Sequence, residues 1–135
     1  MAVTEIKEGE VVLARLIPAS TAWGGGLQFF SPEGDFQQVG TWGYERGKTL
    51  LAHSHKELTR LVPWTQEVLY IRSGRVCADI YDSTDQKVAK LEACAGDILV
   101  LLRGGHGYQI LEDGTQVLEI KNGPYAGTDL DRRRL

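Results

Sequence analysis

The sequence predicts an all-β domain, either a sandwich or a closed barrel, on the basis of three observations. Short stretches rich in Val, Ile, Leu, Tyr and Thr recur along the chain. The 16 glycines, with turn pairs such as Ser73-Gly74 and Asp113-Gly114, separate many of these stretches. Patterns typical of helices are scarce. Because a sheet must bury one face and protect its edges, many short strands in one domain favour a sandwich or a barrel.

The strands are expected between these turns, and the rest of the chain is expected to be loop. The expected strands are residues 11–17, 27–30, 36–44, 49–55, 66–72, 75–81, 88–92, 97–102, 107–112 and 116–121. Residues 18–35 are expected to be rich in loops, and residues 56–65 to form a loop or one helical turn. A chain of 135 residues is long enough for one hydrophobic core and too short for two ordinary domains. We therefore expect a single domain over residues 1–135.

Composition and charge argue against two classes of partner. The net charge is only −3, with acidic and basic residues interspersed, so neither nucleic acid nor an anionic membrane is expected as a partner. The basic run 132–134 stands beside Asp129 and Asp131 and is expected to be a solvated tail. The longest aliphatic run, residues 98–102, is far shorter than the roughly 20 residues that a membrane-spanning helix needs.

The N-terminus and the cysteines predict a cytoplasmic location. The first ten residues carry acidic side chains where a secretory signal needs a basic stretch followed by an apolar run. Cys77 and Cys94 lack the spacing of a metal knuckle and stand in apolar, strand-like contexts. We expect two buried, reduced thiols.

Four residues are candidates for the chemistry of the protein. His53 and His55 are one residue apart, so on a strand their imidazoles project from the same face about 7 Å apart. Such a pair can bind one metal ion or present two titratable nitrogens to a ligand. Glu67 begins an otherwise aliphatic strand face, where a carboxylate needs a partner. His106 begins the face that continues with Tyr108.

Each of these features also has an ordinary structural explanation. His-x-His occurs by chance in surface strands, a glutamate at a strand start commonly faces solvent, and a histidine in a glycine-rich turn can simply bond to backbone. The side chain of Glu119 has apolar neighbours on both sides, so alternation does not assign it to either face. The order and spacing of the four candidates carry more information than any one of them.

Three segments together resemble the two sequence motifs of the cupin superfamily. Residues 47–55 read Gly-Lys-Thr-Leu-Leu-Ala-His-Ser-His, and residues 67–74 read Glu-Val-Leu-Tyr-Ile-Arg-Ser-Gly, similar to the two halves of the first motif. Residues 96–106 read Gly-Asp-Ile-Leu-Val-Leu-Leu-Arg-Gly-Gly-His and are similar to the second motif. The resemblance extends over about residues 40–122.

The resemblance implies a double-stranded β-helix, also called a jelly roll, with a pocket at one mouth of the barrel. The cupin core would span residues 40–122 and residues 1–39 would be an N-terminal extension. By the same resemblance, His53, His55, Glu67 and His106 would bind a divalent metal ion such as iron, manganese, nickel or zinc. Such a ligand set leaves open positions for a small-molecule substrate.

The sequence departs from the family pattern at two places. Eleven residues separate His55 from Glu67, where the family usually has only a few. Leu102 replaces the usual proline of the second motif, and a single residue rather than two precedes His106 after Gly104. The insertion would form a loop over the pocket, and it leaves open whether Glu67 coordinates the metal.

Three functions remain open from the sequence. The first is a metal-dependent oxygenase or isomerase acting on a small organic molecule. The second is a metal-free enzyme similar to the small ketoisomerases of nucleotide-linked deoxysugars, with the histidine pair as acid and base. The third is a binding domain without catalysis. Candidate ligand contacts are Trp64 in the inserted loop, Arg103 near the mouth and Tyr108.

A homodimer is expected. The strand 11–17 has no obvious partner in the barrel and could pair with a second subunit.

Overall fold

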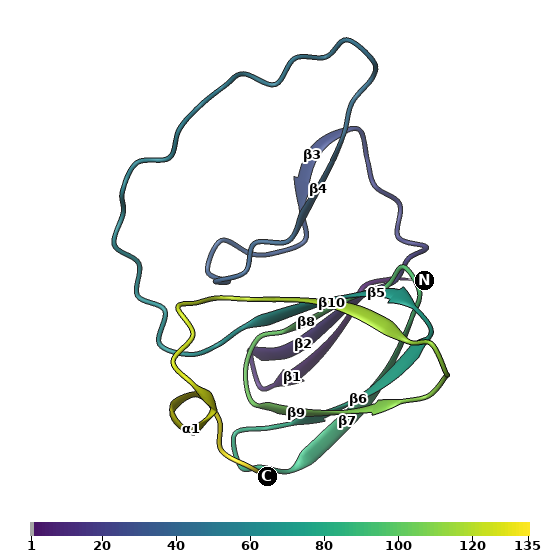
Figure 1. The fold of residues 1–135 in the computed structure, drawn as a ribbon, viewed down its shortest axis with the longest axis vertical. Coiled ribbons are helices and arrows are strands. Elements are labelled where there is room, and N and C mark those ends of the chain that lie inside the picture. The colour runs from purple at the N-terminus through teal and green to yellow at the C-terminus, as the bar shows by residue number, and fades with distance from the viewer. Residues whose placement is uncertain (1) are drawn as a thin grey trace.

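The computed structural model describes residues 2–135, which form ten strands and one short helix (Figure 1). The strands are β1 (Thr4–Glu8), β2 (Val11–Ile17), β3 (Gly26–Phe29), β4 (Gly40–Gly43), β5 (Glu67–Ser73), β6 (Arg75–Tyr81), β7 (Lys87–Cys94), β8 (Ile98–Leu101), β9 (Gly105–Ile110) and β10 (Gln116–Lys121), and the helix is α1 (Thr128–Asp131). The prediction of an all-β fold with little helix is confirmed.

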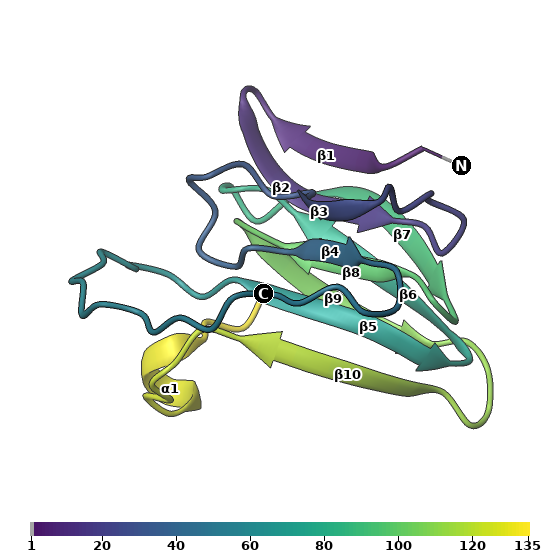
Figure 2. The ribbon, with the colours of Figure 1, turned by 90° about the horizontal axis from the view of Figure 1, so that it is seen from above.

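The strands of the described part of the chain form three antiparallel sheets. The largest has the order β1-β2-β8-β5-β10, and the second has the order β7-β6-β9. These two sheets lie face to face as two layers (Figure 1). The third sheet is the hairpin of β3 and β4, which lies on the far side of the five-stranded sheet from β9 (Figures 1 and 2).

The main hydrophobic core fills the space between the two larger sheets. Alternate side chains of β2, β5 and β8 meet alternate side chains of β6 and β7, as expected for strands with one buried face. The buried core side chains are Leu13, Ala14, Leu16, Leu69, Ile71, Val76, Ala78, Ile80, Leu91, Ala93, Leu99 and Leu101. This packing determines which side chains of β5 and β9 face inwards.

A second, smaller cluster covers the outer face of the five-stranded sheet. It contains Ile17, Val68, Val100 and Leu102, and residues of the segment between β2 and β5, including Phe30 and Val39, pack on it. Because this cluster binds residues 30–39 to the sheet, it places the β3–β4 hairpin on the outer side.

The two larger sheets do not close into a barrel in the described residues. β10 is a terminal strand of one sheet and β9 is a terminal strand of the other. On β9, Tyr108 and Ile110 face inwards because they pair with Ala78 and Val76 of β6. Ala78 and Val76 are 0% and 2% exposed, whereas Tyr108 and Ile110 are 42% and 59% exposed. The interior of the sandwich is therefore open along the side between β9 and β10, which we call the open side.

The predicted strand at residues 49–55 is wrong. This stretch has no strand structure, and every residue from Trp42 to Trp64 is exposed. Residues 44–63, which we call the arm, form a long extended loop that projects away from the sheets (Figure 1). The alternation of apolar and polar residues predicted a strand, but no neighbouring strand completes a ladder with this segment in the structure.

Two further expectations need correction. The strand at residues 11–17 does have partners within the chain, because β2 pairs with β1 on one side and with β8 on the other. Cys77 is a buried free thiol as expected, but Cys94 is exposed. Cys94 is the last residue of β7, and strand alternation directs its side chain away from the core.

Within residues 2–135, no helix is both long enough and apolar enough to cross a membrane.

Candidate functional site

Glu67 starts β5 at the open side of the sandwich. Its neighbours across the sheet are Leu101 of β8 and Lys121 of β10. It faces inwards on the same side of β5 as Leu69 and Ile71, both of which belong to the core. The residue is only 6% exposed, so its carboxylate requires polar partners.

His106 provides the closest polar partner of Glu67. It lies on β9 opposite Ile80 of β6, and a tight turn containing Gly104 precedes the strand. The imidazole Nε2 lies 3.2 Å from the Oε2 atom of Glu67. The Tyr108 hydroxyl lies 3.5 Å from the same carboxylate oxygen, at the limit for a hydrogen bond. One carboxylate thus meets a histidine and a tyrosine from the facing sheet.

The contacts of this group shift the pKa of two of its members. Hydrogen bonding from His106 lowers the pKa of the Glu67 carboxyl below its usual value, against the opposing effect of burial. Burial, with the nearby Glu67 charge, raises the pKa of the Tyr108 phenol well above its usual value. At neutral pH, Glu67 is a carboxylate and Tyr108 is a protonated hydrogen-bond donor.

These three side chains line an open cavity of about 880 Å³ between the ends of the two sheets. Its wall contains residues 64, 65 and 67, residues 81–83 and 85 at the end of β6, residues 103–108, Glu119, and the C-terminal residues 131–135. A volume in this range is typical of small-molecule sites. Glu119 pairs with Leu69, so it faces the interior and supplies another carboxylate to the cavity.

Two of the predicted ligand contacts lie together at the rim. The guanidinium carbon of Arg103 lies 3.6 Å from the centre of the Trp64 ring, which is a cation–π contact. The indole N–H of Trp64 donates a hydrogen bond of 2.9 Å to the backbone oxygen of Leu102. Phe36 also packs against Trp64, and the centres of the two rings lie 4.8 Å apart. Trp64 therefore holds Arg103 in one position at the cavity.

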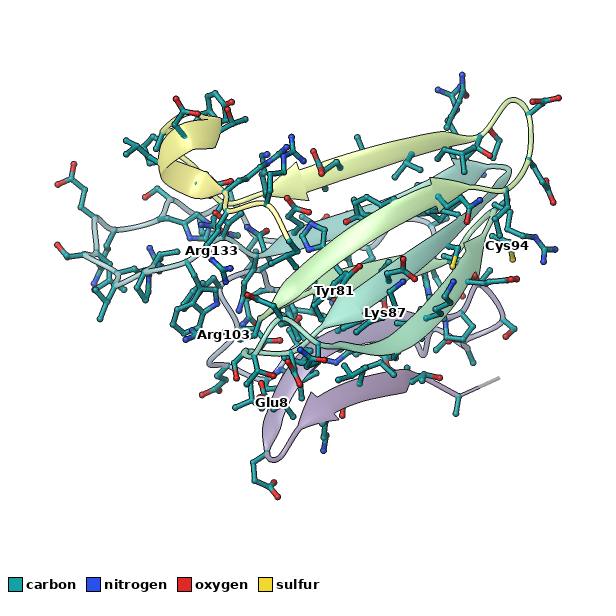
Figure 3. The ribbon with its side chains drawn as sticks, turned by 90° about the horizontal axis from the view of Figure 1, so that it is seen from below. Glu8, Tyr81, Lys87, Cys94, Arg103 and Arg133 are labelled. Carbon is teal, nitrogen blue, oxygen red and sulfur yellow. The ribbon has the colours of Figure 1, made fainter. Side chains whose placement is uncertain are left out.

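The C-terminal residues close one end of the cavity. Arg133 makes a bidentate pair with Asp85, with contacts of 2.7 and 2.9 Å. The hydroxyl of Thr65 donates a hydrogen bond to Asp131. Figure 3 shows Arg133, Arg103 and Tyr81 at the same end of the sandwich. The expectation that residues 132–134 form a solvated tail is therefore incomplete, since they also line the cavity; their local sequence gave no signal for the distant partner Asp85.

The structure places His53 and His55 elsewhere. Both lie in the exposed arm and do not line the cavity. Their ring centres are 5.0 Å apart, and the Nδ1 atom of His53 lies 3.2 Å from the backbone oxygen of Leu51. The four residues predicted to form one site are thus present as two pairs, one in the arm and one in the cavity.

The cavity pair fits a metal ion in part. Two adjacent ligands of a first-row ion, each about 2.1 Å from it, lie about 3 Å from each other at a right angle. The separation of 3.2 Å between Glu67 and His106 suits such an arrangement. Across residues 2–135, however, no three His, Cys, Asp or Glu side chains stand close enough together to hold an ion. Two more ligands would have to come from another segment.

Comparison of the sequence with models of known protein families, with curated proteins and with solved structures found no match.

Proposed function

We propose that this chain is a small cupin-type enzyme that binds a divalent metal ion and a small organic substrate at the open side of its sandwich. The observation that carries the proposal is the contact between Glu67 and His106 inside a cavity of small-molecule size. Both residues occupy the positions that the cupin resemblance assigns to metal ligands. A jelly-roll barrel would require closure of the open side.

The two facing sheets support this reading. Glu67 and His106 come from different sheets, and each lies at the cavity end of its strand. Gly74, whose φ is +81°, allows the tight turn between β5 and β6 that the first motif would require. The carboxylate and the imidazole therefore converge from two layers, which is how a jelly-roll pocket is lined.

The chain's own residues would bind and orient the substrate. If the arm brought His53 and His55 to the cavity, they would complete the ligand set begun by Glu67 and His106. The iron, manganese, nickel or zinc ion held there would supply Lewis-acid chemistry. Arg103, positioned by Trp64, would pair with an anionic group of the substrate. The protonated Tyr108 hydroxyl would donate a hydrogen bond to a substrate oxygen beside Glu67.

Metal content tests the proposal. We expect untagged protein purified without chelator, and supplemented with each of the four ions, to hold close to one equivalent of one of them. His106→Ala should lose most of it, and His53→Ala/His55→Ala should lose at least half. Glu119→Gln is the matched control, because it removes a carboxylate that lines the same cavity. Wild-type protein that takes up none of the four ions would overturn the metalloenzyme proposal.

The direct contact between Glu67 and His106 favours a second candidate, a metal-free proton-transfer enzyme. A carboxylate that orients an imidazole is a common acid–base arrangement, and Tyr108 could donate a proton nearby. Such a site would suit isomerisation of a nucleotide-linked keto-sugar, with Arg103 near the phosphates. Exchange of a sugar C–H proton with D₂O, unaffected by a chelator and lost in His106→Ala, would support this candidate over the metalloenzyme.

A further inference from the structure

The arm, residues 44–63, is an unusually exposed segment for its composition. Leu51 and Leu61 are 85% and 87% exposed, and Leu50 and Leu58 are also exposed. Contacts within the arm itself include the hydrogen bond of 3.2 Å from the Lys48 amide to the Glu45 carbonyl. Leucines gathered on one projecting segment indicate a surface that another surface covers.

Both ends of the arm are attached to the outer side of the five-stranded sheet. At its start, β4 is paired with β3 in the hairpin. At its end, Trp64 is bonded to Leu102 and packs on Phe36. The Gln66 side chain accepts hydrogen bonds from the backbone amides of Phe36 and Gln37, which ties the end of the arm to the loop between β3 and β4. Figures 1 and 2 show the arm and the hairpin on this outer side, with β9 in the layer beyond the five-stranded sheet.

The open side offers a complementary surface. β9 is a terminal strand, so one edge of its backbone is available for pairing, and its inward-facing Tyr108 and Ile110 are exposed. An edge of this kind with apolar side chains readily takes up an added strand. The neighbouring inward face of β10 adds Val117, which is 37% exposed.

The side chains of the arm are complementary to those of β9 when the two segments pair antiparallel. In an antiparallel register with Leu51 opposite Ile110, strand geometry places His53 opposite Tyr108 and His55 opposite His106. The apolar Leu51 then meets the apolar Ile110, and the three imidazoles gather at the cavity end. Lys48 would lie beyond the end of β9, near the acidic residues 112–113 of the turn to β10. A parallel register would instead place Leu51 beside His106 and His55 beside Ile110.

We propose that residues 47–56 of one copy add as a strand to the free edge of β9 in a second copy, and that the exchange is reciprocal. A second copy is the occupant because the arm's own attachments hold it on the side of the five-stranded sheet away from β9. Exchange of identical segments gives a closed two-fold dimer and covers both arms. Each cavity would then contain Glu67 and His106 of one chain with His53 and His55 of the other. This last consequence rests on the proposed metal site, whereas the exchange itself does not.

Disulfide trapping tests the exchange. Leu51→Cys and Ile110→Cys are made in separate chains that also carry Cys94→Ser, and the two chains are co-expressed and oxidised. Directly opposed residues of an antiparallel pair have β-carbons close enough for a disulfide. We expect a covalent dimer at more than five times the yield of either variant alone. Leu50→Cys with Ile110→Cys is the matched control, because alternation directs residue 50 to the opposite face.

A single chain that carries both Leu51→Cys and Ile110→Cys distinguishes exchange from folding back within one chain. Exchange predicts that oxidation converts this chain to covalent dimers. A monomer with an internal disulfide would show that the arm occupies its own β9 edge, and would overturn the proposal. A monomeric mass of the wild-type protein in solution, with no disulfide in either format, would overturn it as well. None of these readouts depends on a bound metal ion. Failure of the metalloenzyme proposal can therefore be distinguished from failure of the exchange proposal.

Discussion

The Nε2 atom of His106 and the Oε2 atom of Glu67, 3.2 Å apart, connect the two larger sheets at their open side. Glu67 belongs to the five-stranded sheet and His106 to the three-stranded sheet. The Tyr108 hydroxyl adds a longer contact to the same oxygen. The polar group that forms the candidate site therefore also contributes to holding the layers together.

The acid stability of the protein should depend on Glu67. Because its pKa in the folded protein lies below the ordinary value of 4.5, the ionised carboxylate stabilises the fold above that pH. This contribution is lost as the pH falls through the folded-state pKa. We expect Glu67→Gln to lower the free energy of unfolding by about 1 kcal/mol at neutral pH. In acid, where the Glu67 carboxylate of the wild type becomes protonated, the free energies of unfolding of the two proteins should become more similar. Urea unfolding at several pH values measures both effects.

Glu119→Gln is the control for this experiment, since Glu119 lines the same cavity from the neighbouring strand. A difference between wild type and Glu67→Gln that stayed constant down to strongly acidic pH would contradict the stabilising role of the ionised carboxylate.

Gly104 should be essential for the placement of His106. Its φ is +74°, and a β-carbon there would lie 2.2 Å from the backbone oxygen of Tyr81. Gly104→Ala should therefore destabilise the fold by about 2 kcal/mol and lower the metal content if the metal proposal holds. Gly107 lies on the same strand with open space where a β-carbon would stand. Gly107→Ala should change stability by only about 0.5 kcal/mol, and thermal melts of the two variants would show the contrast.

Equal melting temperatures for Gly104→Ala and Gly107→Ala would mean that the turn before β9 accommodates a β-carbon without strain. The closeness of residue 104 to the Tyr81 backbone oxygen would then not affect stability.

The two cysteines should differ in reactivity. Cys94 is exposed and Cys77 is buried, so a thiol reagent should modify one thiol rapidly in the native protein and two after unfolding. The Cys94 thiol lies 3.4 Å from the Asp97 carboxylate, which raises the thiol pKa and slows the reaction. Asp97→Asn should therefore increase the rate severalfold at about pH 8.

Cys94→Ser tests whether the fast-reacting thiol is that of Cys94, because this variant should show no fast-reacting thiol. An unchanged rate in Asp97→Asn would indicate that access to the sulfur, and not the thiolate fraction, limits the reaction.

The regular strands were largely predictable from local patterns. Residues 75–81 and 116–121 are bounded on both sides by turn-forming residues, and they form β6 and β10 with the expected limits. β1 was not predicted, because residues 4–8 are mostly charged and polar. Its strand structure depends on pairing with β2, a contact that residues 4–8 do not reveal.

The candidate site was predictable only in its residue types and their order. The pairing of Glu67 with His106 follows from two strands of different sheets whose ends meet, and the sequence motifs anticipated the two residues but not their contact. Asp85 and Arg133 are 48 positions apart, so their pairing left no local pattern. A salt bridge of this kind depends on where the chain end returns.

Residues 47–55 mark the boundary between what local sequence and what tertiary structure decide. Leu51, His53 and His55 stand at every second position, which is compatible with a strand, because side chains two residues apart share one face of an extended backbone. Whether the strand forms depends on a partner edge, since a strand is stable only when its backbone groups pair with another segment. In this structure the arm is attached on the outer side of the five-stranded sheet, while the exposed edge of β9 belongs to the other sheet. Local sequence thus determined the strands and the chemistry of the site residues, and the three-dimensional arrangement of the two sheets decided which of those residues meet.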